Sequence, residues 1–317
     1  RRAETGVIMQ EREWELEGGS LKYTIQDGAV CIVEFHGQTA ELTVPEQIEG
    51  LPVAVIGKKA FLSRKSLRLV RLPGTVREIG DWAFASCSSL KEIQLPRREL
   101  CFGKALFLDC TRLERIVLYG EASPCGAGEP EGQGNTLQTA ELLAAAVTDF
   151  GAYYLLEPPA VGSPEWLEKW DAKLAAVLHT PDEEGFSRQV LCGEEDYGST
   201  DVLAYVSERR REKARLAFLR LLYPWKLAEP QKCELAAYLT AHTKGGESEE
   251  AWQVILRERG NDRVYYSLFA ELGCLNAENL CPVLEDIGEE FPEMKAYFLQ
   301  RMAQAPAATN FFAGLEL

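Results

Sequence analysis

A 23-residue repeat constrains the fold of this chain more than any other feature of its sequence. Three consecutive segments, over residues 53–73, 76–96 and 99–119, align without a gap. In the middle segment the recurring positions are Ile79, Gly80, Phe84, Leu90, Ile93 and Leu95. One copy cannot bury its apolar face alone, whereas stacked copies turn each recurring position into a ladder through a shared core. The fixed period therefore predicts a solenoid.

Each copy is expected to contribute one short strand and one turn. In "SLKEIQL", Ile93 and Leu95 are two residues apart and face the core, while Glu92 and Gln94 face outward. Gly80 suits a tight turn, because glycine adopts backbone angles that other residues avoid. The Ala-Phe pair that follows the glycine is expected to place an aromatic ring in the core.

The middle segment, "VREIGDWAFASCSSLKEIQLP", resembles the repeat of the BspA-like leucine-rich repeat family of bacteria through the pattern "IG…AF…C.SL…I.LP". The lead-in is similar to the irregular first unit of that family, so the resemblance covers residues 21–120. The third copy departs from the pattern, because Tyr119 stands in the place of the closing proline. Members of the family are interaction or adhesion modules with structural repeat residues, so the resemblance implies no active site.

The expected fold class is α+β with several domains. A short leucine-rich-repeat solenoid, with about three 23-residue repeats and an irregular lead-in, is followed by an all-α domain of helical hairpins. The expected parts are an N-terminal extension (1–20), the repeat domain (21–120), a flexible linker (121–136) and an acidic all-helical domain (137–317). A solenoid must cover its last apolar rung, so part of the helical region is expected to cap it.

Past the linker, apolar residues recur at the helical period of about 3.6 residues. Helix candidates cover residues 136–156, 163–180, 199–224, 230–243, 248–259, 262–272, 277–288 and 292–304. Ser163 is suited to N-cap the second of them, with Pro164 at its first helical position. Short helices joined by short turns predict antiparallel hairpins. This region resembles no family closely enough to name one.

The charge of the chain, −15 overall, is unevenly distributed. Residues 1–120 carry a net charge of +1, and residues 121–317 carry −16. We therefore expect no nucleic-acid partner, because phosphate binding needs clustered Lys and Arg. The basic run 208–215 is interpreted as a solvated helix face or a set of internal ion pairs, with a nucleic-acid contact as the alternative. No apolar run reaches the roughly 20 residues that span a bilayer, so we expect no membrane insertion.

Nine cysteines are spread widely over the chain without a C-x-x-C motif. The odd number and wide spacing favour reduced, mostly buried thiols. Cys87 and Cys110 are one repeat apart and are expected to form a small buried ladder. The N-terminus lacks the apolar segment of a signal peptide, so we expect a cytoplasmic protein, with Met9 as a candidate start. A secreted or cell-surface location is the alternative, if a signal peptide has been removed.

The chain carries none of the short motifs of zinc proteases, serine hydrolases or phosphate-binding loops. We therefore expect no catalytic residue, no cofactor and no metal. The loop 192–201 is interpreted as a helix-capping turn, with a calcium site as the alternative, although it lacks EF-hand spacing. The other alternative is an enzyme with its site in the helical half, built from His179, His242, Cys233 or the acids at 194–196.

The expected function is binding of a protein partner, without catalysis, through outward-facing positions of the solenoid. The candidate binding residues are Leu69, Arg71, Trp82, Glu92, Gln94, Arg115 and Val117. An exposed tryptophan is a frequent hot spot of interfaces, although Trp82 could instead pack on the neighbouring helical domain or on an adjacent unit of the solenoid. The second function class is a secreted or cell-surface adhesin or carbohydrate-contacting module of a longer protein.

The first full repeat is basic, with Lys58, Lys59, Arg64, Lys65, Arg68 and Arg71. A basic surface of this kind could dock an anionic partner or the acidic half of the same chain. The alternative is that the repeat forms a solvated end of the solenoid.

Overall fold

The computed structural model describes residues 10–120, 137–151, 155, 159–186 and 201–304. The chain forms two compact units, Arg1–Lys173 and Leu174–Leu317, which divide inside helix α2 (Pro164–His179). The predicted linker 121–136, the loop 192–200 and residues 1–8 lie outside the described residues. Within the described residues, no helix combines the length and the apolar character that crossing a membrane requires.

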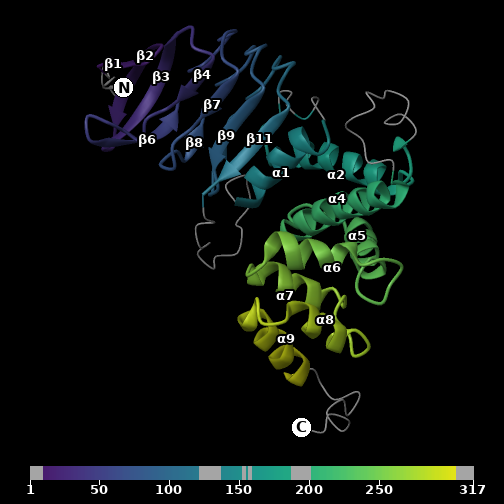
Figure 1. The fold of residues 1–317 in the computed structure, drawn as a ribbon. Helices are drawn as coiled ribbons and strands as arrows, with labels where there is room; N and C mark the ends of the chain where they lie inside the picture. The colour runs from purple at the N-terminus through teal and green to yellow at the C-terminus, as the bar shows by residue number, and fades with distance from the viewer. Residues whose placement is uncertain (1–9, 121–136, 152–154, 156–158, 187–200, 305–317) are drawn as a thin grey trace, which may run out of the picture. The chain divides into compact units, whose positions relative to one another are not determined.

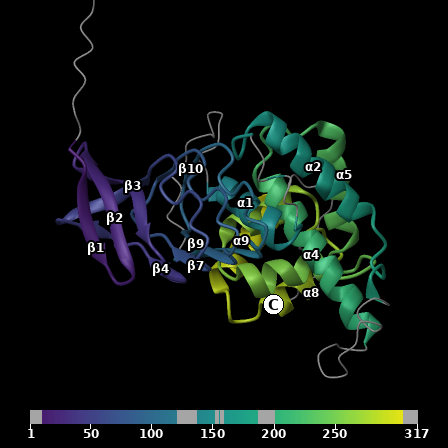
Figure 2. The ribbon, with the colours of Figure 1, turned by 90° about the horizontal axis from the view of Figure 1, so that it is seen from above.

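Unit 1 begins with three antiparallel strands, β1 (Arg12–Leu16), β2 (Gly19–Gln26) and β3 (Ala29–Gly37). Figure 2 shows them side by side at the N-terminal end of the unit. Parallel pairing then adds β6 (Leu51–Ile56), β8 (Glu78–Ile79) and β10 (Cys101–Phe102), and together these strands form sheet A. Residues 12–20, predicted as part of an N-terminal extension, are therefore built into the first sheet of the solenoid.

A second sheet, sheet B, contains one strand from each turn of the solenoid (Figure 1). Its strands are β4 (Glu41–Thr43), β7 (Leu69–Arg71), β9 (Glu92–Pro96) and β11 (Arg115–Tyr119). All of them are parallel and in register. The short strand β5 (Gln47–Ile48) forms a hairpin with β6, and this insertion places β4 more than one repeat length before β7. The predicted solenoid with an irregular lead-in is confirmed.

The core of unit 1 consists of apolar ladders that follow the repeat. The rings of Phe35, Phe61, Phe84 and Phe107 form a ladder, with centroid distances of 5.7, 4.9 and 5.7 Å between successive members. The first pair is tilted, and the other two pairs are stacked. Cys87 and Cys110 form the predicted buried ladder. Each thiol donates a 3.1 Å hydrogen bond to the carbonyl of a phenylalanine one turn earlier. These contacts bind each turn of the solenoid to the turn before it.

Two other features of the turns are set by close contact between the backbones of successive copies. A Cβ atom at Gly80 would lie 2.7 Å from the nitrogen of Lys58, so glycine is required there by crowding. The prediction that this glycine serves a tight turn through its conformational freedom was wrong, because Gly80 has no positive φ. Lys59, Trp82 and Ala105 do have positive φ, at 62°, 54° and 49°. Such angles cost a non-glycine residue about 1–2 kcal/mol. The backbone N–H groups of Lys59 and Trp82 each donate to a carbonyl of the following turn, which holds these two residues in place.

Helix α1 (Leu137–Thr148) packs against β11 and covers the last rung of the solenoid, as the sequence predicted for this region. The Thr148 hydroxyl accepts a hydrogen bond from the backbone of Ile116, and Arg97 forms a 2.9 Å ion pair with Glu141. The helix predicted over 136–156 is shorter than expected, because Gly151 adopts φ 55° just after its end. Leucine-rich repeats and their helical cap therefore belong to one compact unit.

The N-terminus of α2 has the predicted cap. The Ser163 hydroxyl accepts a 3.3 Å hydrogen bond from the backbone of Trp166, and Pro164 begins the helix. The indole of Trp166 donates to the carbonyl of Leu155, and the indole of Trp170 donates to that of Leu142. Both indoles are fully buried, so the start of α2 belongs to the core of unit 1.

Unit 2 is helical (Figure 1), and its first helix contacts several of the helices that follow it. They are α4 (Val202–Leu222), α5 (Glu229–Ala241), α6 (Glu250–Gln253), the π-helical turn η2 (Val254–Arg259), α7 (Arg263–Glu271), α8 (Leu280–Ile287) and α9 (Pro292–Gln304). An aromatic cluster of Trp252, Tyr266, Phe269 and Phe298 forms its core. The predicted helical C-terminal part is confirmed.

Candidate functional site

The outward face of sheet B, hereafter the strand face, brings together six of the seven candidate binding residues. Strand pairing aligns Leu69, Glu92 and Arg115 in one row across β7, β9 and β11. A second row, two residues further along each strand, consists of Arg71, Gln94 and Val117. The residues between the rows, such as Ile93, are buried in the core. The rows therefore project from the side of the sheet opposite to the core.

The strand face is wider than the sequence indicated. Glu41 and Thr43 of β4 extend the two rows by one strand, because they pair in register with Leu69 and Arg71. Sequence reasoning missed them, since the hairpin insertion breaks the 23-residue spacing between β4 and β7. The signal available was the short alternating stretch "ELTV" before the insertion.

Tyr119 organises one end of the strand face. Its hydroxyl donates a hydrogen bond to the carbonyl of Leu72. Leu72 directly follows β7, which is separated from β11 by β9. The Arg71 guanidinium lies 4.3 Å from the centre of the Tyr119 ring. The position that departs from the repeat pattern thus forms a cation–π contact next to the candidate binding rows.

The charges on the strand face are of both signs and are partly paired. Arg115 lies 3.5 Å from Glu92, and Gln94 donates a 2.7 Å hydrogen bond to the same carboxylate. The Arg115 side chain is 61% exposed, whereas that of Glu92 is 20% exposed. A weak, exposed pair of this kind can exchange its partner for a group on another protein at little cost.

Trp82 does not lie on the strand face. It belongs to the turn between β8 and β9, and its backbone N–H donates to the carbonyl of Lys104 in the next turn. Its ring is partly exposed, and the ammonium groups of Lys58 and Lys59 lie 4.9 and 5.6 Å from the ring centre. Trp82 therefore packs on side chains of the adjacent solenoid turn, as one of the two sequence interpretations expected.

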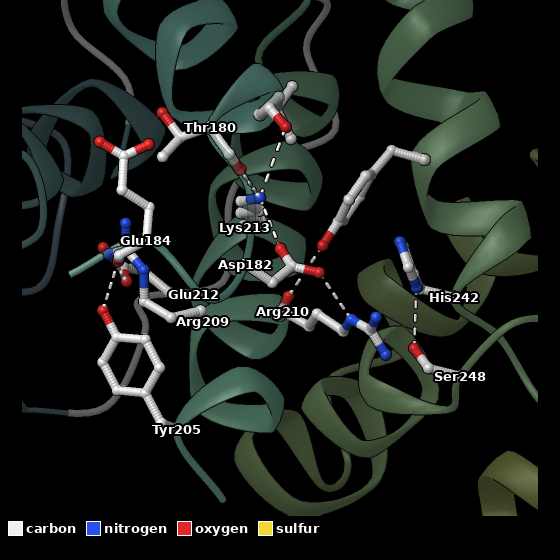
Figure 3. A network of polar contacts seen from close by, with 12 residues as sticks. Thr180, Asp182, Glu184, Tyr205, Arg209, Arg210, Glu212, Lys213, His242 and Ser248 are labelled. Atoms are coloured by element: carbon white, nitrogen blue, oxygen red, sulfur yellow. Dashed lines mark hydrogen bonds and ion pairs between the residues drawn. The ribbon is translucent and has the colours of Figure 1, made fainter. Parts of the chain in front are cut away.

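The main polar cluster of unit 2 surrounds Lys213 (Figure 3). Lys213 is 3% exposed, and its ammonium donates to the carbonyls of Leu178 and Thr180, at 3.4 and 2.6 Å, and to Asp182 at 2.6 Å. Arg210 donates a 2.7 Å hydrogen bond to the other oxygen of Asp182. Since the last carbonyls of a helix have no partner within it, Lys213 supplies the missing donor at the end of α2.

The electrostatics of this cluster favour an ionised carboxylate. Partial burial opposes ionisation of Asp182, but the hydrogen bonds from Lys213 and Arg210 outweigh it and hold the pKa of Asp182 below its usual value. All three ammonium hydrogens of Lys213 have acceptors. The cluster therefore presents neither a free base nor a free nucleophile, and its role is to hold α2 and α4 together.

His242 and Ser248 close the loop between α5 and α6. The His242 Nδ1 atom lies 2.8 Å from the Ser248 hydroxyl, and the ring packs on Tyr238. Burial lowers the pKa of His242, and nearby Arg210 acts in the same direction. A serine nucleophile requires a histidine that a third group orients through its other nitrogen. Among the described residues, no carboxylate forms a hydrogen bond with that nitrogen of His242, so the pair is a loop contact.

The other residues named for an enzyme site in the helical half do not assemble with His242. His179 forms a 2.8 Å pair with Glu234, and the imidazole side chain is 71% exposed. Cys233 is exposed and has no hydrogen bond to either histidine in the described part of unit 2. The acids at 194–196 lie outside the described residues. No cluster of three or more metal-ligating side chains is found in the described ranges.

The basic run 208–215 forms internal ion pairs, which was one of the two interpretations favoured from the sequence. Arg209 pairs with Glu212, Arg210 and Lys213 pair with Asp182, Arg211 pairs with Glu208, and Arg215 pairs with Glu208 and Glu258. These cations are engaged within unit 2 by its own carboxylates.

Comparison with known families identifies the repeats. Residues 38–127 match the model of the BspA type leucine rich repeat region, in 6 copies. The N-terminal third of the chain is therefore a region of BspA-type leucine-rich repeats, as its motifs predicted. The comparison with curated proteins gave no match.

Several solved structures are similar to this third of the chain. A leucine rich repeat protein from T. pallidum is 29% identical, with a TM-score of 0.26, over 33% of this chain and 50% of that one. A leucine rich cell surface protein from Faecalibacterium prausnitzii A2-165 is 24% identical, with a TM-score of 0.28, over 33% and 30%. A leucine-rich repeat protein from Bacteroides ovatus ATCC 8483 is 23% identical, with a TM-score of 0.26, over 32% and 28%. This chain thus spans half or less of these relatives.

Proposed function

We propose that this chain is a non-catalytic protein-binding protein that contacts its partner through the strand face. The observation that carries the proposal is the alignment of two outward rows, Leu69–Glu92–Arg115 and Arg71–Gln94–Val117, on adjacent in-register strands. Neither row contributes to the core, which the alternating residues fill. The side chains of the rows are therefore available to form an interface.

The chemistry of the strand face supports a protein partner. Arginine and tyrosine, present here as Arg71 and Tyr119, are enriched in protein interfaces. Leu69 and Val117 add apolar surface beside them that a partner can bury. Leu69 and Val117 are partly buried, whereas Arg71 and Arg115 are exposed. The nearly balanced charge favours recognition by shape and paired hydrogen bonds over long-range attraction.

The proposed location is the cytoplasm. The described cysteines, Cys31, Cys87, Cys101, Cys110, Cys233, Cys274 and Cys281, are all free thiols, which supports a reducing compartment. The alternative is the secreted or cell-surface adhesin. A titration of the protein isolated from its own cells under non-reducing conditions separates the two. Nine free thiols support the cytoplasm, and disulfides among them support the adhesin.

Affinity capture with matched variants tests the binding surface. The full chain would be used as bait against lysate and culture medium of its source cells. Gln94→Lys combined with Val117→Lys adds two positive charges to neighbouring strands of the strand face. Glu99→Gln combined with Glu114→Gln changes the net charge by the same amount at exposed turn positions. Both variants would be checked for an unchanged unfolding midpoint.

The proposal expects the wild type and the turn variant to retain the same proteins, and the strand-face variant to lose them. Equal retention by all three baits would place the interface elsewhere. If no bait retains any protein from either source, the protein-binding function itself is contradicted.

A further inference from the structure

The turns that connect sheets A and B carry a basic and aromatic surface outside the strand face. We define the turn patch by Lys58, Lys59, Trp82 and Lys104. Lys58 and Lys104 are two turns apart at equivalent positions of the repeat, and Lys59 and Trp82 are one turn apart at another. The lysines are exposed, and the ammonium groups of Lys58 and Lys59 converge on the Trp82 ring at 4.9 and 5.6 Å.

The cations of the turn patch are not paired with a carboxylate in the described part of the chain. Among the described residues, no Asp or Glu oxygen lies within 4.0 Å of the ammonium group of Lys58, Lys59 or Lys104. Asp81 lies between Lys58 and Lys104 in the repeat, but its carboxylate accepts a 2.8 Å hydrogen bond from the backbone of Lys104. The stretch 50–77 holds seven Lys and Arg residues and no Asp or Glu.

Nearby cations show the contrast. Arg64 belongs to the same basic repeat, and its guanidinium forms a 2.9 Å ion pair with Glu34. The Lys22 ammonium lies 3.8 Å from the same carboxylate. Lys58 and Lys59 therefore belong, with Lys65, Arg68 and Arg71, to the cations of the basic repeat that form no ion pair in the described structure, and they differ from the others by their shared contact with the indole.

The fold does not require a tryptophan at position 82. The equivalent positions hold Lys59 and Ala105, and all three adopt the same left-handed backbone. Bulky residues are rare in that conformation. The core is filled instead by Phe84, two residues later, which is fully buried. The indole of Trp82 is thus a surface group at a position where the third repeat functions structurally with alanine.

We propose that the turn patch binds an acidic peptide segment of a partner protein. Ammonium groups form strong, charge-assisted hydrogen bonds with carboxylates, and an indole gives an apolar side chain of the same peptide a large rigid surface. A short segment needs few cations, which suits three lysines on a chain with a net charge of −15. A nucleic acid or another long polyanion would need a denser array of cations.

This inference goes beyond the strand face and does not depend on it. A direct test uses the full chain and a fluorescein-labelled peptide with two glutamates on each side of a leucine. Binding would be followed by fluorescence anisotropy, at about 50 mM and 300 mM NaCl because screening weakens charge pairing. A peptide with glutamine in place of glutamate is the ligand control, and a labelled sulfated hexasaccharide tests the competing class of anion.

The variants separate the turn patch from general charge. Lys58→Gln with Lys59→Gln removes two of its cations, and Trp82→Ala copies the natural residue of the third repeat. Lys91→Gln with Arg112→Gln removes the same charge from exposed positions outside the patch. Gln94→Ala with Val117→Ala changes the strand face alone. Unfolding midpoints confirm that each variant is folded.

We expect the glutamate peptide to bind the wild type more tightly than the glutamine peptide, and more weakly at high salt. The double lysine variant and Trp82→Ala should each weaken binding about tenfold or more, while the two control variants should bind as the wild type does. Unchanged binding by the double lysine variant overturns the proposal. Tighter binding of the sulfated hexasaccharide than of the peptide assigns the patch to another ligand class and also overturns it.

Discussion

Replacing the buried Lys213 by methionine should destabilise unit 2 far more than removing a lysine from its surface. The substitution keeps an unbranched apolar stem of similar length but removes the ammonium group that donates to the carbonyl of Thr180 and to one oxygen of Asp182. Arg210 remains bonded to the second oxygen of Asp182. The end of α2 and the carboxylate would then lose a partner inside the protein.

The size of the effect follows from burial. Removing one partner of a buried ion pair costs about 3–5 kcal/mol. The Lys213 side chain is 4% exposed, and that of Asp182 is 19% exposed, so water can reach part of the carboxylate. We therefore expect about 3 kcal/mol for Lys213→Met, the lower end of that range. Lys232, which pairs with Glu229 at 3.5 Å with 46% and 79% of the side chains exposed, is the control. Lys232→Met should change the stability by about 0.5 kcal/mol or less.

Hydrogen exchange at increasing urea concentration measures this difference within one unit of a two-unit chain. Peptides covering residues 202–241 should open at a urea concentration about 1–2 M lower in Lys213→Met than in the wild type. Asp182→Asn in the same background completes a double-mutant cycle and isolates the pair. Equal opening of Lys213→Met and Lys232→Met would refute the assignment of Lys213 as the residue that holds α2 to α4.

Three further outcomes follow from the structure. Phe84→Ala removes the ring between Phe61 and Phe107 and should destabilise unit 1 by about 3–5 kcal/mol in urea unfolding. Phe84→Leu should cost less, and an equal loss of stability in both variants would contradict the stacked core. Burial lowers the pKa of His242 in the folded state, so the unfolded state binds more protons as the pH is lowered below about 6.5. The protein therefore loses stability as the pH is lowered through this range. His242→Gln should flatten that part of the stability–pH curve, because Asp182 and Glu250 act only at lower pH. An unchanged curve would contradict the assignment of this pH dependence to His242. At pH 8, iodoacetamide should label the exposed Cys281 rapidly and Cys87, whose pKa burial raises to about 11, only after unfolding, as followed by mass spectrometry.

The repeat period predicted sheet B because two rules act together. A fixed spacing of 23 residues sets which residues are neighbours on successive turns, and the two-residue alternation of strands sets which of them face outward. Both rules apply to Glu92 and Gln94, and the structure places them on the strand face. The spacing fails at β4, where the β5 hairpin inserts extra residues, and Glu41 and Thr43 were missed for that reason.

Long-range polar contacts could not be predicted in the same way. Lys213 lies in a basic run that, by composition alone, is equally suited to a solvated helix face. Its partner Asp182 is 31 residues earlier, beyond the end of another helix, and no periodicity relates the two. Trp82 was predicted as a binding residue, but the sequence did not show that it lies on the turns, beside Lys58 and Lys59.

Site-specific photo-cross-linking in the source cells tests the strand face most directly. A benzophenone amino acid would replace Gln94 on β9, or Glu99 in the following turn as the control. If the strand face is the binding surface, position 94 should form a light-dependent adduct with a discrete partner protein and position 99 should not. An adduct of the same yield at both positions, or at position 99 alone, would contradict a binding role for the strand face.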